Sequence, residues 1–339
     1  MTLDHAIALS LVENLPRVNL TDRLKNDANL LSQATPLLEK ARTIRARAER
    51  AGIHVVAWND ARFPAALTTL TDLPPVLWYE GHLSATELPA LGIVGSRAAS
   101  AVAIETVSRL AADVSALGIT VVSGLARGVD SAAHRAALRT GRTIAVLGSG
   151  LDRVYPGEHA SLAKEIARDG LVVSEFPPGC PPLKHHFPMR NRLISGLSLG
   201  VVVIEASDKS GSLITASCAL EQGREVMVVP GNVLSGRNKG GHGLLRDGAK
   251  IVECADDIVR ELGWCREPDA TQGSQITRCH QAISGDPLIL QMSAGQPYDV
   301  DELTALSGLE PKRLLPRLLD LELRGFVRRA GGGRFLRSF

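Results

Sequence analysis

The feature that most constrains the fold of this chain is a regular alternation of apolar runs and amphipathic stretches that begins near residue 90. Six short runs rich in valine and isoleucine occupy residues 91–96, 119–124, 143–150, 171–176, 200–207 and 225–231. They are apolar almost throughout, which is typical of strands buried on both faces of a parallel sheet. The stretches between them, such as 100–118 and 212–223, have helical periodicity and end in glycine, as many helices do. We therefore predict an α/β fold with a doubly wound sheet.

Glycine occurs together with serine or arginine where most of these strands end. The segments are 95–97 (GSR), 123–130, 148–157, 174–179, 205–212 and 230–232. Ligands of doubly wound sheets bind beyond the carboxyl ends of the strands, and backbone amides at glycine-rich turns and helix N-termini favour phosphate. We therefore expect a phosphate-binding rim. Its charge comes from Arg97, Arg190 and Arg192, and its hydroxyl groups come from Ser96, Ser210 and Ser212.

The segment 187–198 (FPMRNRLISGLS) places an arginine on each side of an asparagine. An unpaired buried arginine is costly, so we expect an anion to meet Arg190 and Arg192. This anion is a structural carboxylate, the phosphate of a nucleotide, or a chain of phosphates. Glu175 and Glu205, at neighbouring strand ends, are candidates for the carboxylate, and we expect one of the two arginines to be structural.

Motifs for nucleotide binding and catalysis are incomplete in this sequence. The stretch 148–150 (GSG) lacks the third glycine of the dinucleotide fingerprint, and 243–250 (GLLRDGAK) has its lysine one residue too late for a phosphate-binding P-loop. Ser123, Asp130 and His134 suggest a catalytic triad, but no nucleophile elbow surrounds the serine. We interpret His134 as a residue that orders or caps a helix.

Seven segments, taken in order, resemble the DNA-processing protein A family, also called Smf. They are 94–97 (VGSR), 123–134 (SGLARGVDSAAH), 148–156 (GSGLDRVYP), 174–179 (SEFPPG), 187–198 (FPMRNRLISGLS), 203–216 (VIEASDKSGSLITA) and 223–232 (GREVMVVPGN). The resemblance spans roughly residues 50 to 260 and implies an extended Rossmann-like fold that binds single-stranded DNA without hydrolysing nucleotides. It also implies a homodimer that protects incoming DNA and loads the RecA recombinase in natural transformation.

Carried over residue by residue, the resemblance implies DNA contacts for basic and aromatic side chains in and around the segment 187–198. These are Arg97, Lys184, Phe187, Arg190, Asn191 and Arg192. Such a groove suits single strands, because the cations follow the phosphates and a base stacks on the aromatic ring. Glycines and serines of the rim complete the predicted site, namely Gly95, Ser96, Ser123, Gly124, Ser210, Gly211 and Ser212. No catalytic residue is predicted.

Four positions depart from the usual pattern of this family. Glu158 stands where a basic residue is common, His159 replaces an asparagine, and Lys239 and His242 stand where serine and asparagine are common. The alternative function is that of a nucleotide-binding enzyme similar to phosphoribohydrolases, which have a related Rossmann-like fold. Thr215 stands where their catalytic glutamate belongs, so the acid or base of a glycosyl-cleaving reaction is missing. This substitution favours binding over catalysis.

We predict four parts of the chain. They are a small helical N-terminal domain at 1–48, an extended Rossmann-like core at 49–262, a linker at 263–280 and a winged-helix domain at 281–339. The run 53–58 (IHVVAW) is expected to join the sheet of the core. The segment 73–83 (LPPVLWYEGHL) is interpreted as a boundary before the periodic region.

The winged helix is predicted from a turn at Ser307–Gly308, a helix from about Pro311 and a strand, glycine turn and strand in the tail. This part of the chain is basic. Residues 311–339 carry a net charge of +6, from Lys312, Arg313, Arg317, Arg324, Arg328, Arg329, Arg334 and Arg337 against Asp320 and Glu322. Such a cluster suits nucleic acid or another acidic partner and is also common on solvated surfaces. Winged helices bind DNA or protein, and both remain open here.

Composition places the chain in a reducing compartment. The five cysteines contain no CxxC pair, so neither a metal site nor a disulfide framework is indicated. No apolar run approaches the roughly 20 residues of a membrane-spanning helix, and the N-terminal segment lacks the basic region of a signal peptide. We therefore expect a cytoplasmic protein without membrane contact, metal or cofactor.

Overall fold

The computed structural model describes residues 2–12, 15, 28–263, 297–307, 309, 311–323, 327–330 and 334–337. The chain divides into two compact units, Met1–Arg266 and Glu267–Phe339, and each is described by itself. Apart from Gly263, the predicted linker at 263–280 lies outside the described residues.

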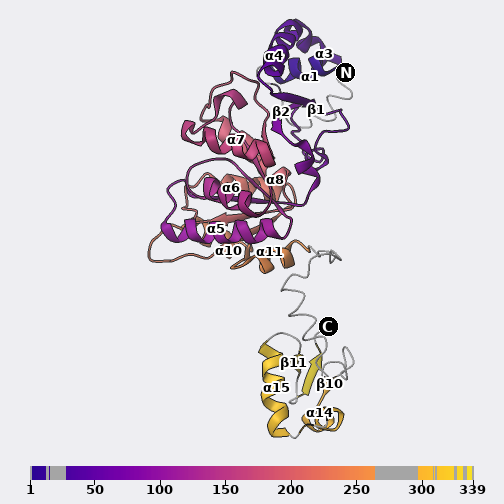
Figure 1. The fold of residues 1–339 in the computed structure, drawn as a ribbon, viewed down its shortest axis with the longest axis vertical. Coiled ribbons are helices and arrows are strands. Elements are labelled where there is room, and N and C mark those ends of the chain that lie inside the picture. Colours follow the sequence, from indigo (N-terminus) through magenta and orange to yellow (C-terminus); the bar gives the residue numbers. More distant parts are fainter. Residues whose placement is uncertain are drawn as a thin grey trace. The chain divides into compact units, whose positions relative to one another are not determined.

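The first unit, which Figure 1 shows in colours from indigo to orange along the chain, contains a nine-stranded sheet. Its strand order is β1-β2-β6-β5-β4-β3-β7-β8-β9. Neighbouring strands from β6 to β9 are parallel, with β4, β5 and β6 on one side of β3 and with β7, β8 and β9 on its other side. This is the predicted doubly wound arrangement, and each of the six apolar runs contains one of the strands β3 to β8. The strands are β1 (His54–Ala57), β2 (Val76–Gly81), β3 (Ala90–Gly95), β4 (Thr120–Ser123), β5 (Thr143–Val146), β6 (Leu171–Ser174), β7 (Gly200–Ile204), β8 (Glu225–Val228) and β9 (Lys250–Ile251).

Strand β2 shows that the boundary predicted at 73–83 is wrong. It pairs antiparallel with β1 on one side and with β6 on the other, so it connects the predicted strand at 53–58 to the parallel sheet. Trp78 of β2 is fully buried. Pro74 and Pro75 precede the first residue of the strand, where a missing amide hydrogen does not interrupt the ladder.

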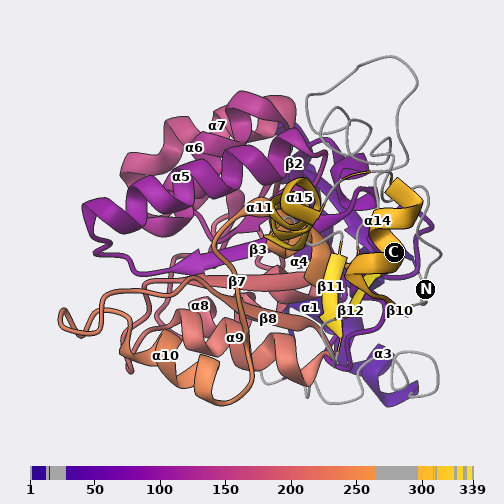
Figure 2. The same cartoon turned by 90° about the horizontal axis from the view of Figure 1, so that it is seen from below.

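Helices cover both faces of this sheet (Figure 2). One face carries α8 (His186–Gly196), α9 (Ser212–Glu221) and α10 (Lys239–Arg246), and the other carries α5 (Ala101–Ala116), α6 (Val129–Thr140), α7 (Ala160–Asp169) and α11 (Ala255–Glu261). The consecutive residues Ile93 and Val94 of β3 belong to the cores on opposite faces. Burial on both faces explains why the strand sequences are apolar throughout.

The helices predicted in the first 48 residues are α1 (Leu3–Ser10), α3 (Ala28–Ala34) and α4 (Leu38–Arg50). They share a core with the sheet, because Ile7 of α1 and Ala48 of α4 are buried in the same cluster as Trp78. Two arginines of α4, Arg42 and Arg45, form ion pairs with Asp4 at 3.5 and 2.8 Å. Short 3-10 helices occupy Thr35–Leu37, Ala65–Leu67, Leu83–Glu87, Leu151–Arg153 and Gly157–His159. Among the described residues, no helix combines the length and apolarity that a membrane span requires.

The second unit is the predicted winged helix. Its elements are β10 (Pro297–Tyr298), α14 (Val300–Ser307), α15 (Pro311–Leu323), β11 (Val327–Ala330) and β12 (Arg334–Arg337). The helix from Pro311 and the hairpin of β11 and β12 confirm the sequence-based prediction, whereas β10, which pairs with β12, was not predicted. Leu314 and Leu318 of α15 pack with Phe335 of the hairpin in a separate apolar core.

Candidate nucleic-acid interface

A groove of about 890 Å³ opens beyond the carboxyl ends of β3 and β7. These strands are neighbours in the sheet although β4, β5 and β6 intervene in the chain, so the groove lies at a topological switch point, where ligands of such sheets bind. Ten of the predicted site residues line it, namely Gly95, Ser96, Arg97, Lys184, Phe187, Arg190, Asn191, Ser210, Gly211 and Ser212. The other three, Ser123, Gly124 and Arg192, are not among its lining residues.

Phe187 stands at the centre of a small aromatic and cationic cluster in the wall of this groove. The centroid of its ring lies 5.5 Å from that of Tyr155 and 5.4 Å from the guanidinium carbon of Arg97. A guanidinium above a ring makes a favourable cation–π contact, which orients Arg97 without neutralising it. Arg97 and Tyr155 are exposed and Phe187 is half-buried, so a ligand in the groove reaches all three.

Arg190 lies at the floor of the groove, where backbone oxygens hold its guanidinium. Its Nη1 donates to the carbonyl oxygens of Gly124, at 2.8 Å, and of Val146. Gly124 permits this approach, because a Cβ there would lie 2.5 Å from a guanidinium nitrogen. Asp130 accepts hydrogen bonds from the backbone of Gly124 at 3.1 Å and of Ala126 at 3.4 Å. Burial lowers the pKa of Arg190 to about 10, against the opposing effect of Asp130, and the guanidinium therefore stays charged at neutral pH.

Arg192 lies on the other side of α8 and is paired with carboxylates. Its Nε lies 2.6 Å from Asp72 Oδ2, and its Nη2 lies 2.7 Å from Glu175 Oε2. The expected pairing of Glu175 with one of the two arginines is thus confirmed. Arg192 lines a separate pocket of about 630 Å³, together with Phe176 and His186, whose rings stack at a centroid distance of 4.0 Å.

Ser123 and His134 are engaged in internal hydrogen bonds that do not form a triad. The hydroxyl of Ser123 donates to the carbonyl of Ile93 at 2.6 Å. The hydroxyl of Thr143 donates to the carbonyl of Val121 and lies 2.7 Å from Nδ1 of His134, which therefore donates to it. Burial is the main reason why the pKa of His134 is lowered to about 3. The neutral imidazole fastens α6 to β5, in agreement with the structural interpretation of this residue.

The N-terminus of α9 forms the wall of the groove opposite Arg97. Ser210 Oγ and Ser212 Oγ lie 2.7 Å apart, and the side-chain amide of Asn191 donates to the carbonyl of Gly211 at 3.3 Å. Gly211 is the N-cap residue, and a Cβ there would meet no atom within 4 Å. The first amides of α9 are bonded within their own turn, because Ser212 donates to Ser210 Oγ at 3.4 Å and Leu213 donates to the carbonyl of Ser210 at 3.1 Å. The helix dipole still favours an anion at this end.

Comparison with known proteins shows which family has this arrangement. Residues 54–263 match the family described as DNA recombination-mediator protein A, and residues 286–333 match the DprA winged helix domain. The chain belongs to the DNA recombination-mediator protein A family. A curated relative, Protein Smf of Escherichia coli (strain K12), is 40% identical over 291 residues, which are 84% of this chain and 78% of that protein.

Two solved structures of family members are similar to the protein. DNA processing protein A from Streptococcus pneumoniae matches with a TM-score of 0.68 and 35% identity, over 77% of this chain and 98% of that chain. DNA processing protein A from Helicobacter pylori, described for its unique single-stranded DNA binding mode, matches with a TM-score of 0.56 and 29% identity. That match covers 62% of this chain and 95% of the other.

The first two departures from the usual family pattern make internal contacts. Glu158 accepts two hydrogen bonds from Arg127, at 2.7 and 2.8 Å, on an exposed surface. His159 is buried, and its Nδ1 donates to the carbonyl of Leu125 at 2.8 Å. The negative charge of Glu158 is therefore paired with Arg127, which belongs to the family segment 123–134.

The other two departures lie after β8. Nζ of Lys239 is 4.0 Å from Asp208 Oδ2 and is largely exposed, and Nε2 of His242 lies 3.1 Å from the carbonyl oxygen of Gly231. Lys239 therefore keeps a positive charge close to the segment 205–212 that borders the groove.

Further polar residues line the groove, namely Asp130, Tyr155, Glu205, Ser207, Thr215 and Arg237, and the predicted site included none of them. Glu205 was considered only as a partner for an arginine of α8. Tyr155 belongs to the family segment 148–156, which follows a glycine-rich strand end. This position was the signal in the sequence that could have indicated a groove residue. Arg237 lies in the loop between β8 and α10, and the local sequence does not determine where this loop runs. Thr215, in the position of the catalytic glutamate of phosphoribohydrolases, is buried in the groove wall on α9.

Proposed function

We propose that the protein binds single-stranded DNA in the groove and acts as a recombination mediator without hydrolysing nucleotides. The observation that carries the proposal is the convergence of Arg97, Lys184 and Phe187 with the N-terminus of α9 in one groove at the switch point. The Helicobacter pylori relative, described for its single-stranded DNA binding mode, supports the same ligand.

Each part of the groove has a role in this proposal. Arg97 and Lys184 are exposed cations that follow the phosphates, and Phe187 with Tyr155 offers ring faces on which bases stack. The hydroxyls of Ser210 and Ser212 at the N-terminus of α9 receive one phosphate, which the helix dipole favours. Arg190 contributes positive potential from the floor. Arg192 is left out of the proposed contacts, because two carboxylates already neutralise it.

The absence of an enzymatic role is part of the proposal and rests on the state of the polar groups. A general base at neutral pH needs a pKa near 7, and His134 has a pKa lowered to about 3. Ser123 donates its hydroxyl proton to the carbonyl of Ile93, and Thr215 offers no carboxylate. These features support binding over the alternative of a phosphoribohydrolase-like enzyme.

A protein that holds single strands without a motor activity protects them or transfers them to another protein. By resemblance to its family, we propose that the receiver is the RecA recombinase and that the protein acts as a homodimer in the cytoplasm. Two subunits that each hold one DNA segment suit both RecA loading and annealing. The winged helix presents Lys312 and Arg313 on the exposed side of α15, and DNA and protein remain alternative partners for it.

The test of DNA binding is a gel-shift titration with single- and double-stranded oligonucleotides over a series of salt concentrations. We expect the double variant Arg97→Glu/Lys184→Glu to bind single strands more weakly and to flatten the salt dependence. Each lost phosphate contact reduces the slope of log K against log salt by about 0.7 for single strands. The matched control is Arg109→Glu/Arg139→Glu, which reverses two exposed charges on α5 and α6. Equal affinity and slope in both folded variants would locate the DNA site elsewhere.

The mediator role is tested separately, by filament formation on single strands that are precoated with the single-strand-binding protein of the host. The protein is expected to restore RecA nucleation on these strands, and Arg97→Glu is expected to restore much less. Strong DNA binding by the wild type without RecA nucleation or annealing would reject the mediator role and leave a DNA-binding protein.

A further inference from the structure

Two helices begin beside each other at the switch point of the sheet. α5 follows β3 through the loop 96–100, and α9 follows β7 through the loop 205–211. In Rossmann folds that bind dinucleotides, the pyrophosphate lies at the N-terminus of the helix after the first strand of the parallel sheet. In this protein that helix is α5, so its N-terminus is the position where a nucleotide phosphate is expected.

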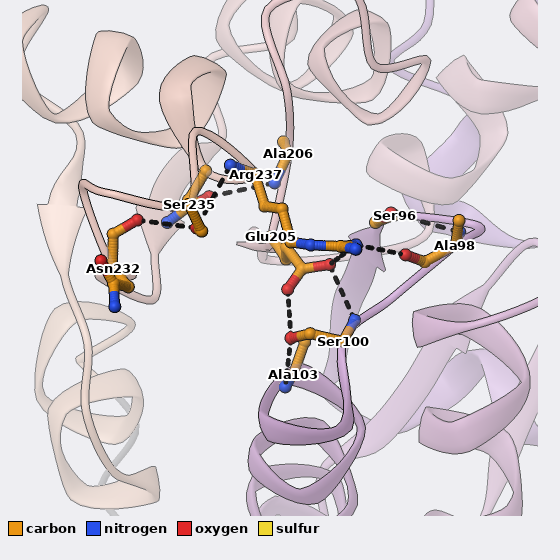
Figure 3. A network of polar contacts seen from close by, with 10 residues as sticks. Ser96, Ala98, Ser100, Ala103, Glu205, Ala206, Asn232, Ser235 and Arg237 are labelled. Carbon is orange, nitrogen blue, oxygen red and sulfur yellow. Dashed lines mark hydrogen bonds and ion pairs between the residues drawn. The ribbon is translucent and has the colours of Figure 1, made fainter.

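The side chain of Glu205 fills this position (Figure 3). The backbone amide of Ser100 donates to Oε1 of Glu205 at 2.9 Å, and the hydroxyl of Ser100 donates to Oε2. The same hydroxyl accepts a hydrogen bond from the backbone amide of Ala103 at 3.2 Å, and it thereby caps α5. Glu205 is 9% exposed. A buried carboxylate thus bonds to the N-cap residue of α5, at the end of the helix where an anion is favourable.

The end of β7 and the loop after β8 hold the carboxylate in place. Glu205 itself leaves β7 with a φ of 50°, a conformation that is unfavourable for residues other than glycine. Arg237, from the loop after β8, places Nη1 3.8 Å from Oε1 of Glu205 and donates to the carbonyl of Ala98 at 3.0 Å (Figure 3). Asn238 fixes this loop, because its side chain bonds to the amide of Ala206 and the carbonyl of Val229, both at 3.0 Å.

The N-terminus of α9 differs from that of α5. Its described hydrogen bonds join Ser210 Oγ to the hydroxyl and the backbone amide of Ser212, and the side-chain amide of Asn191 to the carbonyl of Gly211. A Cβ at Gly211 would meet no atom within 4 Å. The amides of Leu213 and Ile214 donate to the carbonyls of Ser210 and Gly211, at 3.1 and 3.2 Å. Of these two helix N-termini, that of α5 has a carboxylate among its described contacts and that of α9 does not.

We propose that Glu205 is a built-in anion that closes the nucleotide-phosphate position of this Rossmann-like sheet to free nucleotides. The proposal rests on the proposed binding of single-stranded DNA. Repulsion between Glu205 and a phosphate at α5 keeps free nucleotides out of the groove. A DNA strand, which is held through several phosphates, does not depend on that position. Abundant nucleotides consequently do not compete with DNA.

The decisive variant is Glu205→Gly in the full-length protein, with fluorescently labelled ADP as the probe. Glycine adopts the observed φ readily, and its introduction exposes the amide and hydroxyl of Ser100 beside Arg237. We expect the variant to bind the labelled ADP more tightly than the wild type by roughly tenfold or more, and we expect unlabelled pyrophosphate to displace the probe. Glu205→Gln keeps the bulk and removes the charge, so a smaller gain is expected. Glu158→Gly is the matched control for the loss of an exposed glutamate, and no gain is expected there.

The outcomes separate this proposal from the proposed function. A folded Glu205→Gly protein that binds labelled ADP no more tightly than the wild type, or a gain of equal size in Glu158→Gly, overturns the role of Glu205. If Glu205→Gly does not fold, Glu205→Gln decides, and the absence of any gain there also overturns it. Failure of the wild type to bind an oligonucleotide in the same buffer rejects DNA binding, while the nucleotide comparison between variants remains valid.

Discussion

The two sides of α8 carry the same residue type in opposite surroundings. Arg190 faces the groove at the switch point, where two backbone carbonyls receive its hydrogen bonds. Arg192 faces a second pocket, where Asp72 and Glu175 both pair with it. Arg190 therefore adds positive potential to a surface that faces a ligand, whereas Arg192 is part of an internal ion-pair network. The same residue type therefore contributes to a candidate binding surface at position 190 and to the stability of the fold at position 192.

Helix geometry explains why these two arginines diverge. Residues two positions apart on an α-helix point in directions that differ by about 200°, so neighbouring arginines with one residue between them do not face the same ligand. From the sequence, both arginines were expected on one rim, with one of them structural, because no helix was predicted for 187–198. The structure shows that most of this segment is helix.

The largest expected effect is that of Arg192 on the stability of the fold. We expect Arg192→Ala to lower the free energy of unfolding by about 3–5 kcal/mol, because it removes a buried cation that pairs with both Glu175 and Asp72. Urea denaturation followed by circular dichroism measures the change. Arg62→Ala, which removes an exposed partner of Asp60, is the control and is expected to change stability by about 1 kcal/mol or less. Unchanged stability with weaker DNA binding would place Arg192 among the DNA contacts and remove the contrast.

A second change tests the floor of the groove. Gly124→Ala puts a methyl group 2.5 Å from a nitrogen of Arg190, and such crowding typically costs about 1–3 kcal/mol. We expect a lower thermal midpoint together with weaker binding of single strands, because the guanidinium must move. Gly243→Ala, whose Cβ would meet no atom within 4 Å, should leave both quantities near their wild-type values. A stable Gly124→Ala protein would show that Arg190 adjusts its position freely.

A third change sharpens the groove side of the comparison. We expect Phe187→Ala to weaken binding of a single-stranded oligonucleotide by about 1–3 kcal/mol, the usual value of one base stacked on an aromatic ring. Fluorescence anisotropy at fixed salt measures the loss, and the salt dependence should stay unchanged because no charge is removed. Leu183→Ala, an exposed apolar side chain in the same segment, is the control. Equal effects of the two substitutions would argue against stacking at Phe187.

The smallest effect is expected from removal of the second unit. A chain that ends near Gly273 keeps the whole groove and the three apolar cores around the sheet, so it should retain most of its affinity for single strands. Gel shifts of the truncated and full-length proteins at several salt concentrations provide the comparison. Loss of binding in a truncated protein with an intact circular dichroism spectrum would assign the site to the basic winged helix.

Features that depend on interactions within one segment could be predicted from the sequence, whereas features that depend on contacts between distant segments could not. The apolar runs predicted β3 to β8 because burial on both faces leaves a local mark on the sequence. The glycine and serine residues at their ends predicted most of the groove, because carboxyl ends of parallel strands meet at one edge. Strand β2 was missed because it follows two prolines and is buried only over its first three residues, so its sequence has no apolar run over the whole strand. Tyr155 was missed because one exposed aromatic residue indicates a site only once its neighbours are known.

The sequence by itself determined the doubly wound sheet, the winged helix and most of the residues that converge at the switch point. Only the tertiary structure decided which charged groups pair with one another. Arg192 meets Asp72 from a segment more than a hundred residues away, and Glu205 reaches the N-terminus of α5 across the β3–β7 pair. The physical reason is that hydrophobic periodicity acts over a few residues of one element, whereas a buried charge is stabilised by whichever opposite group or helix end the folded chain brings within about 4 Å.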